Sequence, residues 1–385
     1  MSVEGCDDSG TPLQASDRKL NVMILASALY IGGAETIIGY LARAIDRQRF
    51  NLTVCHLEKR GVIGDELHRE GIDIVGIPLP ASSKVDYLAF LKLLKVVRAK
   101  RIDVVHTHTT QGLVDSCLCK LLMPRLRVVH TFHFGNYPHT RKSIIWMERI
   151  FSRLADRLMA VGDVQRRQIQ ALYRFSEARI GTVRNGVALR SGSDASSFRC
   201  KFGGENCILI GTIATFIPQK GLTDLLDVAK AIRDSGRKSR FVVVGDGQLR
   251  AELEGKRKLL GLEDDVVFTG WVNSAADAAL PAFDIFFQPS LWEAMSMVIL
   301  EAMGAGKPVV ATRVGENSKV IEDGIDGLLV QARDIGGMVA ALGRLIDDAA
   351  LRIRLGEAAR LKVQQRFTVE HMTRAYEEIY LDLMR

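Results

Sequence analysis

Long apolar runs, aromatic residues and paired cysteines are all scarce in this sequence of 385 residues. No apolar run reaches the roughly 18–20 residues that a membrane-spanning helix needs, so no spanning segment is expected. Only 6% of the residues are aromatic although 47% are hydrophobic, which fits an α/β protein rich in aliphatic side chains. The first twenty residues are polar and partly acidic, without the form of a secretory signal.

The sequence also lacks cysteine pairs with a metal-binding spacing and the common dinucleotide-binding motif at the start of either half. The six cysteines stand singly apart from Cys117-x-Cys119, which is not a zinc-binding spacing. Free thiols are typical of a cytoplasmic protein, and we expect that location. A Gly-x-Gly-x-x-Gly sequence does not follow the first expected strand of either half, which argues against an ordinary nicotinamide dehydrogenase.

Positive charge is concentrated in the first half of the chain. Residues 1–195 hold 28 Lys or Arg and 19 Asp or Glu, a surplus of nine, whereas residues 196–385 hold 24 and 26, a deficit of two. A basic half indicates an anionic partner, namely membrane lipid, nucleic acid or a phosphorylated substrate. Nucleic acid is the weaker interpretation, because aromatic side chains are not interleaved with the basic ones.

Residues 141–190 carry much of this charge, with eleven Lys or Arg against four acids. Within that stretch an apolar stripe is formed by Ile144, Ile145, Trp146, Met147, Ile150 and Phe151, and residues 82–101 repeat the basic and apolar composition. This pattern predicts that the first half lies on an anionic membrane surface. The alternative is that the apolar stripe faces the sheet and the arginines are solvated.

Short apolar runs alternate with helical patterns along the chain, which predicts two successive parallel sheets covered by helices. The expected strands are 21–26, 50–57, 72–77, 102–106, 127–132, 157–161 and 180–183, followed by 207–214, 241–245, 266–270, 284–288, 309–312 and 327–330. The expected organisation is a disordered tail (1–19), a first Rossmann-like domain (20–190), a linker (191–206), a second such domain (207–366) and a C-terminal helix (367–385).

The stretch from Asp284 to Thr312 has the most informative pattern, which predicts strand, loop, helix and strand. Glu293 stands where the loop meets a helix predicted over 293–303, and Glu301 follows about two turns later. The side chains between the two acids are apolar except Ser296, so the helix is expected to be buried, and buried Glu is uncommon unless paired or used. Both acids stand beside the carboxyl edge of a parallel sheet, where open α/β sheets bind ligands.

Three further patterns are candidates for function. Gly32 and Gly33 follow the first strand and open a helix, where they form either a tight turn or a phosphate-binding site made of backbone N–H groups. Lys220 opens the first helix of the second half, where the helix dipole disfavours a lysine. Either an anion binds there or the side chain is a solvated surface lysine. Five of the eight histidines lie between residues 106 and 139; satisfied histidines at strand ends are favoured over a metal site. His133, at a carboxyl strand end, is the best candidate to contact a reacting group.

Together these motifs resemble the retaining glycosyltransferase family 4 of the GT-B fold from Asn21 to Arg385. The matching motifs are Gly-Gly-Ala-Glu at 32–35, Asp-Val-Val-His-Thr-His at 103–108, Thr131-x-His133, Asn185-Gly186-Val187, Pro218-Gln219-Lys220-Gly221, Val-Val-Val-Gly-Asp-Gly at 242–247, Phe-Thr-Gly at 268–270 and the Glu293/Glu301 segment. The resemblance implies two Rossmann-like domains that face each other across a cleft, acceptor domain first and donor domain second, with the last helix crossing back to the first. It also implies transfer of a hexosyl unit from a nucleotide-diphosphate sugar to a glycan or lipid-linked acceptor, in polysaccharide or glycolipid synthesis.

The resemblance also implies roles for single residues. Lys220 would neutralise the leaving diphosphate, Glu293 would hold sugar hydroxyls, and His133 would lie near the anomeric carbon. Glu301 would accept hydrogen bonds from the ribose hydroxyls. The other implied donor-binding residues are Gly32, Gly33, Thr215, Met295, Ser296, Met297 and Val298. No cofactor or divalent metal is expected, because lysine and helix N-termini stabilise the charge.

Two positions depart from the family pattern. Thr215 stands where an arginine is usual, five residues before the lysine. Lys319 stands at the acid of the usual Gly-Gly-x-x-Glu, which here reads Gly-Glu-Asn-Ser-Lys from Gly315, so Lys319 either supplies the missing charge or the donor site is weakened. Two alternatives therefore stay open, a sugar-nucleotide 2-epimerase of the same architecture and a catalytically impaired partner subunit. The expected partners are a nucleotide-sugar donor, the acceptor and an anionic membrane surface, but no nucleic acid.

Overall fold

The computed structural model of the chain describes residues 18–30, 32–77, 88–135, 141–189, 196–202 and 207–385. The chain forms two compact units. The first comprises Met1–Phe132, Thr140–Met159 and Thr373–Arg385, and the second comprises His133–His139 and Ala160–Met372. The predicted tail lies almost wholly outside the described residues and the predicted linker partly so, and the domain boundaries stay predictions.

The first sheet has seven strands in the order β3-β2-β1-β4-β5-β6-β7. These strands are β1 (Leu20–Ala26), β2 (Phe50–His56), β3 (Asp73–Gly76), β4 (Val104–Thr107), β5 (Arg127–Phe132), β6 (Arg157–Ala160) and β7 (Ile180–Thr182). The helices between them are α1 (Gly33–Ala44), α2 (Gly61–Arg69), α3 (Ala89–Ala99), α4 (Thr110–Leu122), α5 (Lys142–Phe151) and α6 (Asp163–Tyr173). Strand β1 pairs in parallel with both β2 and β4, so that Ile24 lies between Val54 and His106.

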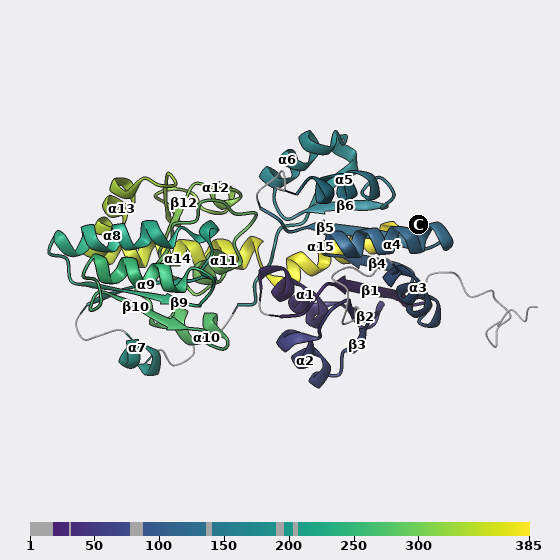
Figure 1. Ribbon diagram of the computed structural model, residues 1–385, viewed down its shortest axis with the longest axis horizontal. Helices are drawn as coiled ribbons and strands as arrows, with labels where there is room; N and C mark the ends of the chain where they lie inside the picture. The colour runs from purple at the N-terminus through teal and green to yellow at the C-terminus, as the bar shows by residue number, and fades with distance from the viewer. Residues whose placement is uncertain (1–17, 31, 78–87, 136–140, 190–195, 203–206) are drawn as a thin grey trace, which may run out of the picture. The chain divides into compact units, whose positions relative to one another are not determined.

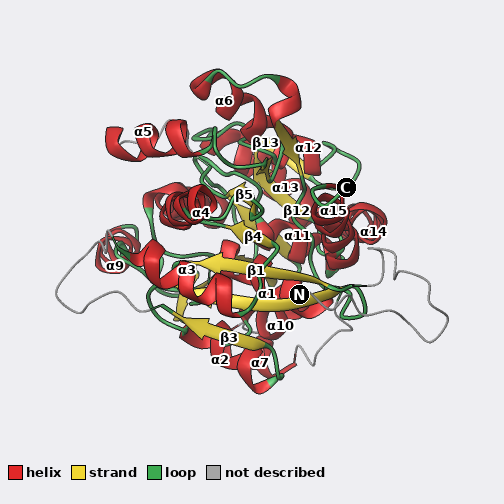
Figure 2. Ribbon diagram, turned by 90° about the vertical axis from the view of Figure 1, so that its right-hand side faces the viewer, coloured by secondary structure: helices red, strands yellow, loops and turns green. Residues whose placement is uncertain are grey.

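Helices cover this sheet in two rows. Helix α1 packs beside α2, whereas α4 packs between α3 and α5. Figure 2 shows these helices around the strands of the first sheet. The core between sheet and helices is aliphatic, with Met23, Leu25 and Val105 wholly buried. This layered arrangement is what the alternation of apolar runs predicts.

The second sheet has six strands in the order β10-β9-β8-β11-β12-β13. These strands are β8 (Ile208–Ile213), β9 (Ser239–Val244), β10 (Val266–Gly270), β11 (Ile285–Gln288), β12 (Val309–Thr312) and β13 (Leu328–Val330). The helices are α7 (Ser196–Phe202), α8 (Leu222–Asp234), α9 (Arg250–Leu259), α10 (Ala275–Ala279), α11 (Met297–Gly304), α12 (Asn317–Val320), α13 (Ile335–Asp347), α14 (Ala349–Arg366) and α15 (Val369–Asp382). Short 3₁₀ turns occur at Glu177–Arg179, Pro218–Lys220 and Leu280–Ala282. Figure 1 shows both sheets with their helices.

The prediction of two parallel-sheet α/β domains is confirmed. All thirteen expected strands occur among the described residues, most with ends shifted by one or two residues. Strands buried on both faces read as continuous apolar runs, which is why they were predictable. Two helix starts were wrong: α8 begins at Leu222, after the 3₁₀ turn that holds Lys220, and α11 begins at Met297 rather than at Glu293.

The end of α15 belongs to the first unit, where two tyrosines meet the histidine of β4. The Tyr380 hydroxyl lies 2.6 Å from Nδ1 of His106, and Nε2 of the same ring lies 2.8 Å from Oγ1 of Thr131. The Tyr376 hydroxyl lies 3.1 Å from that threonine oxygen. Both ring nitrogens of His106 therefore have hydrogen-bond partners, which agrees with a structural histidine. Burial raises the pKa of Tyr376 to about 12, so its hydroxyl stays protonated.

Candidate active site

The loop between β11 and α11 is ordered by two polar side chains at its ends. Gln288 ends β11, and its Oε1 accepts a hydrogen bond from the Ser296 hydroxyl over 3.1 Å. Ser296 also caps α11, since its Oγ accepts from the backbone N–H of Ile299. Serine is a strongly preferred N-cap residue, so the helix starts after it. Glu293 therefore lies in the loop, and the two acids are not two turns apart on one helix.

The carboxylate of Glu293 is buried and surrounded by hydrogen-bond donors. Its Oε1 accepts from Lys220 Nζ over 2.7 Å, from Gln288 Nε2 over 2.8 Å and from Ser290 Oγ over 2.7 Å. Its Oε2 lies 3.2 Å from Gln219 Nε2. A buried carboxylate is costly unless it is paired and hydrogen-bonded, and both conditions hold here. These hydrogen bonds hold the carboxylate in one orientation at the carboxyl end of β11.

Lys220 reaches Glu293 because two backbone segments approach closely. The N–H of Leu291 donates to the carbonyl of Gln219 over 2.7 Å, which joins the two loops. Gly221 has a φ of 61°, and a Cβ there would lie 2.0 Å from the carbonyl oxygen of Pro289. Only glycine fits this position. The ammonium of Lys220 carries three donors, so its bond to Glu293 leaves capacity for an anion.

Two further glycines pack against the backbone beside Glu293. Gly315 has a φ of 49°, and a Cβ there would lie 1.9 Å from the Glu293 carbonyl oxygen. A Cβ on Gly135 would lie 2.4 Å from the N atom of Ala294. Gly135 follows the half-buried His133 by two residues, and both belong to the second unit. The structure therefore brings the His133 segment to the loop of Glu293.

The other predicted donor-binding residues of the second unit fall into two groups. Met295 and Ser296 are buried in the loop, and Met297 and Val298 form the first turn of α11, so this group adjoins Glu293. Met295 is fixed by Asn185, whose Nδ2 donates to the Met295 carbonyl over 3.3 Å. The second group comprises the half-buried Glu301, within α11, and the exposed Thr215, which follows β8.

Gly32 and Gly33 belong to the first unit and start α1. Gly32 is the N-cap, and its carbonyl accepts from the N–H and the hydroxyl of Thr36. A Cβ on Gly32 would lie 2.3 Å from a carboxylate oxygen of Glu35, so the side chain of that acid covers this glycine. Burial raises the pKa of Glu35.

Glu316 is a buried acid that carried no predicted role, although it stands in the motif that departs from the family pattern. Its carboxylate accepts from the N–H groups of Asp163, over 2.8 Å, and Val164, over 2.9 Å, which are the first two of α6. Its own N–H donates to the carbonyl of Ala294 over 3.0 Å. All these residues lie in the second unit. Gly162, the N-cap of α6, has no side chain to cap the helix, and this is a signal in the sequence that could have pointed to an acceptor from another segment.

Gln219, Gln288 and Ser290 also carried no predicted role, yet all three donate to Glu293. Among the described residues, no group of three or more His, Cys, Asp or Glu is placed to hold a metal ion. His139, part of the histidine cluster, lies outside those residues. Lys319 is exposed on α12, so whether it replaces the missing cation stays a prediction.

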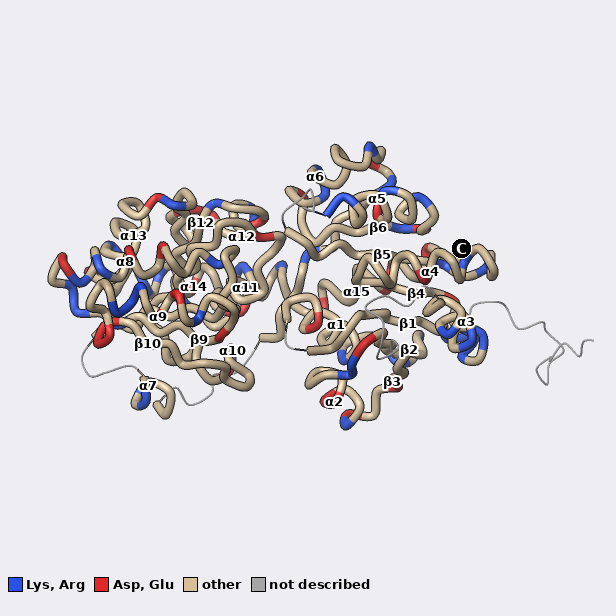
Figure 3. Tube along the Cα trace, in the orientation of Figure 1, with Lys and Arg blue, Asp and Glu red and all other residues tan. Residues whose placement is uncertain are grey.

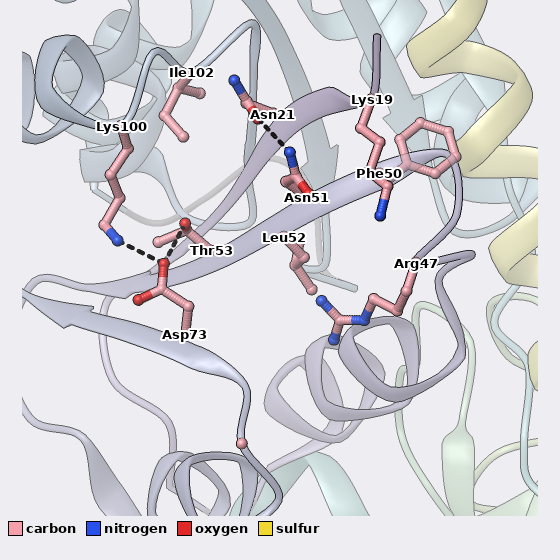
Figure 4. A pocket seen from close by; sticks show the side chains of 11 residues that line it. Lys19, Asn21, Arg47, Phe50, Asn51, Leu52, Thr53, Asp73, Lys100 and Ile102 are labelled. Atoms are coloured by element: carbon pink, nitrogen blue, oxygen red, sulfur yellow. Dashed lines mark hydrogen bonds and ion pairs between the residues drawn. The ribbon is translucent and has the colours of Figure 1, made fainter. Parts of the chain in front are cut away.

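Figure 4 shows a separate cavity of about 470 Å³ in the first unit, beside the amino ends of β1, β2 and β3. Lys100 donates to Asp73 across its wall over 2.6 Å, while Lys19 and Arg47 point into it. Parallel sheets bind ligands at their carboxyl ends, so this cavity is at the wrong edge for the predicted chemistry. We assign it no role.

Two family models match the chain. Residues 31–191 match the model described as Glycosyltransferase Family 4, and residues 205–348 match the one described as Glycosyl transferases group 1. The chain belongs to the family 4 glycosyltransferases. The two matches together span most of the chain and include every predicted site residue, from Gly32 to Glu301.

Similar proteins agree with this membership. This glycosyltransferase is 27% identical to the UDP-Gal:alpha-D-GlcNAc-diphosphoundecaprenol alpha-1,3-galactosyltransferase of Escherichia coli over 313 residues, which are 78% of this chain and 80% of that protein. It is 32% identical to the lipopolysaccharide core biosynthesis glycosyltransferase LpsD of Rhizobium meliloti (strain 1021) over 215 residues, 56% of this chain and 58% of the relative. Its fold is similar to that of Anabaena HepE in complex with UDP and glucose, with a TM-score of 0.82 and 22% identity over 94% of this chain and 100% of HepE.

Proposed function

We propose that this enzyme transfers a hexosyl unit from a nucleotide-diphosphate sugar to a hydroxyl of a lipid-linked saccharide, with retention of anomeric configuration. The observation that carries the proposal is the buried Glu293 carboxylate, held by Lys220 at the carboxyl end of β11. Support for the donor comes from Anabaena HepE, whose fold is similar and which binds UDP-glucose. Support for the acceptor comes from the relative that acts on a diphosphoundecaprenol saccharide.

In the proposed reaction, the bond between the anomeric carbon and the diphosphate breaks, and negative charge grows on the leaving diphosphate. The acceptor oxygen bonds to the anomeric carbon, and its proton passes to the leaving diphosphate. Lys220 donates to that diphosphate and stabilises the charge, together with backbone N–H groups of the first turn of α11. Glu293 accepts hydrogen bonds from sugar hydroxyls and fixes the ring. Four donors already orient its carboxylate, so little ordering is needed on binding.

Glu301 is proposed to hold the ribose hydroxyls through charge-assisted hydrogen bonds, each contributing roughly 1.5–3 kcal/mol. His133 is proposed to lie near the anomeric carbon, since its segment packs on the Glu293 loop. We propose that the reaction needs no divalent metal, because Lys220 and backbone N–H groups take over the charge stabilisation. The roles of Gly32, Gly33 and Thr215 stay predictions.

A screen of nucleotide sugars by thermal unfolding tests the donor. A ligand at about 100 times its dissociation constant adds about 2.7 kcal/mol to the free energy of unfolding, so the true donor stands out from the other bases and sugars. The selected donor is then incubated with undecaprenyl-diphosphate saccharides, and the product is analysed by mass spectrometry. Failure of every nucleotide sugar to stabilise the protein would contradict the proposal.

The same incubation separates the proposal from its alternatives. NMR of the product reports the anomeric configuration, and an inverted linkage would contradict retention. Incubation with UDP-N-acetylglucosamine alone tests the epimerase, because epimerisation needs no acceptor. Binding of a nucleotide sugar without transfer to any acceptor would instead favour the impaired partner subunit.

A further inference from the structure

Helix α5 exposes two of its apolar side chains and buries its acid. Trp146 is 66% exposed and Ile150 is 37% exposed, whereas Glu148 is the buried residue of the helix. The Glu148 carboxylate accepts from the hydroxyl of Thr110 over 2.8 Å, which holds the helix in this rotation. A surface helix normally turns its apolar stripe towards the core. The alternative that this stripe faces the sheet is therefore wrong for these two residues.

Neighbouring helices extend the exposed apolar surface. On α4, Leu121 is 61% exposed and Leu122 is 54% exposed, and on α3 Leu91 is also exposed. Helix α4 touches both neighbours, since Cys119 Sγ donates to the Phe90 carbonyl of α3 and Cys117 Sγ donates to the Phe151 carbonyl of α5. Leu91, the α4 leucines and Ile150 are thus exposed on three helices that pack next to one another in the first unit. Single exposed leucines are ordinary, but a group on three packed helices indicates a partner.

The charged side chains exposed on these three helices are all positive. Helix α3 carries no acid, and the acids of α4 and α5 are Asp115 and Glu148, both buried. The exposed cations on and beside the helices include Lys92, Lys95, Arg98, Arg125, Lys142 and Arg149. Figure 3 shows this basic colour on α3 and α5. Helical spacing places Lys142, Trp146 and Ile150 on one face, four residues apart.

We propose that α3, α4 and α5 form a docking surface for an anionic lipid bilayer, with Trp146 and the leucines entering the interface and the cations meeting lipid phosphates. A negatively charged membrane surface favours exposed apolar side chains surrounded by cations, and on these helices both acids are buried. Tryptophan favours the boundary between headgroups and acyl chains. The inference rests on the proposed function, because a bilayer is where a lipid-linked acceptor is found.

Co-sedimentation of the full chain with vesicles tests the surface. The protein should bind vesicles of phosphatidylcholine mixed with phosphatidylglycerol more tightly than vesicles of phosphatidylcholine alone, and binding should fall as salt rises. One basic residue near an anionic leaflet contributes about 1 kcal/mol, which is a factor of about five in the partition coefficient. The Trp146→Ser/Arg149→Gln variant should therefore bind at least about fivefold more weakly.

The matched control is Leu259→Ser/Lys258→Gln, which removes an exposed apolar and an exposed basic side chain from α9 in the second unit. It should bind vesicles like the wild-type protein. Equal wild-type binding to both kinds of vesicle, or equal loss in the two double variants, overturns the proposal. A dimer that Trp146→Ser dissolves, without vesicle binding, would assign the face to a second copy and overturn it too.

The proposed function is read independently in the same samples. Thermal stabilisation by the nucleotide sugar, measured without lipid, should be unchanged in Trp146→Ser/Arg149→Gln, which shows that this variant is folded. Vesicle binding without any effect of nucleotide sugars would leave the docking surface standing and reject the proposed reaction. Donor binding without a preference for anionic vesicles would leave the proposed reaction standing and reject the docking surface.

Discussion

The contact between Gly162 and Glu316 predicts a reversal in the effect of one substitution. A Cβ on Gly162 would lie 2.4 Å from Cδ of Glu316, whose buried carboxylate accepts from the first two N–H groups of α6. The carboxylate cannot move aside without losing those hydrogen bonds. Gly162→Ser should therefore destabilise the wild-type protein, by about 1–3 kcal/mol as in other overpacked sites.

Removal of the carboxylate changes that outcome. Glu316→Ala leaves the two N–H groups without their charged acceptor, and hydrogen bonds to charged groups contribute about 1.5–3 kcal/mol each. Allowing for water entering the space, we expect a loss of about 2–4 kcal/mol. In this background a serine side chain at position 162 has room and can accept from the freed N–H groups, and a serine N-cap contributes about 1 kcal/mol. Gly162→Ser should thus stabilise Glu316→Ala.

Urea unfolding of the wild type, the two single variants and the double variant measures this cycle. The expected coupling between the two sites is at least about 2 kcal/mol, well above the roughly 0.3–0.5 kcal/mol error typical of independent sites. Glu322→Ala, which removes an exposed carboxylate from the same segment, serves as the control and should change stability by less than about 0.5 kcal/mol. Additive effects of Gly162→Ser and Glu316→Ala would refute the reasoning.

Two further predictions concern a cation of the site and a histidine of the first unit. Lys220→Ala should lower turnover at saturating donor by about 10²–10³, because a preorganised cation that stabilises the leaving diphosphate is lost. Near-full turnover in Lys220→Ala would reject this role. The same assay of Lys319→Ala shows whether that exposed lysine contributes. Burial lowers the pKa of His130 from 6.5 to about 4, so the folded protein favours the neutral ring. The contribution of this ring to the free energy of unfolding is present above pH 6.5 and is lost as the pH falls through about 4. Urea unfolding should show that the wild type loses about 2–3 kcal/mol more than His130→Asn between pH 7 and pH 4.5, and parallel pH profiles would contradict this.

The sheets were predictable because most of their strands are buried on both faces. Strands such as β12, which begins with Val309, Val310 and Ala311, contain short apolar runs, and that signal can be read without knowledge of the tertiary structure. The start of α11 was not predictable in the same way. Apolar residues continue from Ala294 to Leu300 through both loop and helix, and only the Ser296 cap, which the apolar spacing hides, separates them.

The surroundings of the candidate site depended on contacts between distant segments. Glu293 was identifiable from its own motif, but Gln219 lies 74 residues away in sequence and meets it only in the folded chain. Glu316 is the clearest example. Its position looked like a mere departure from a glycine motif, yet the structure shows that it caps α6 and that Gly162 makes room for it. Such pairs of compensating residues cannot be read from one position at a time.

Nucleotide binding and turnover in two acid variants test the central claim most directly. Calorimetry with UDP and an assay with the selected nucleotide sugar are applied to the wild type, Glu293→Gln and Glu301→Gln. If the proposed division of roles holds, Glu293→Gln binds UDP like the wild type but loses turnover, while Glu301→Gln binds UDP about 10- to 100-fold more weakly. Equal loss of UDP affinity in both variants, or full turnover in Glu293→Gln, would contradict the account.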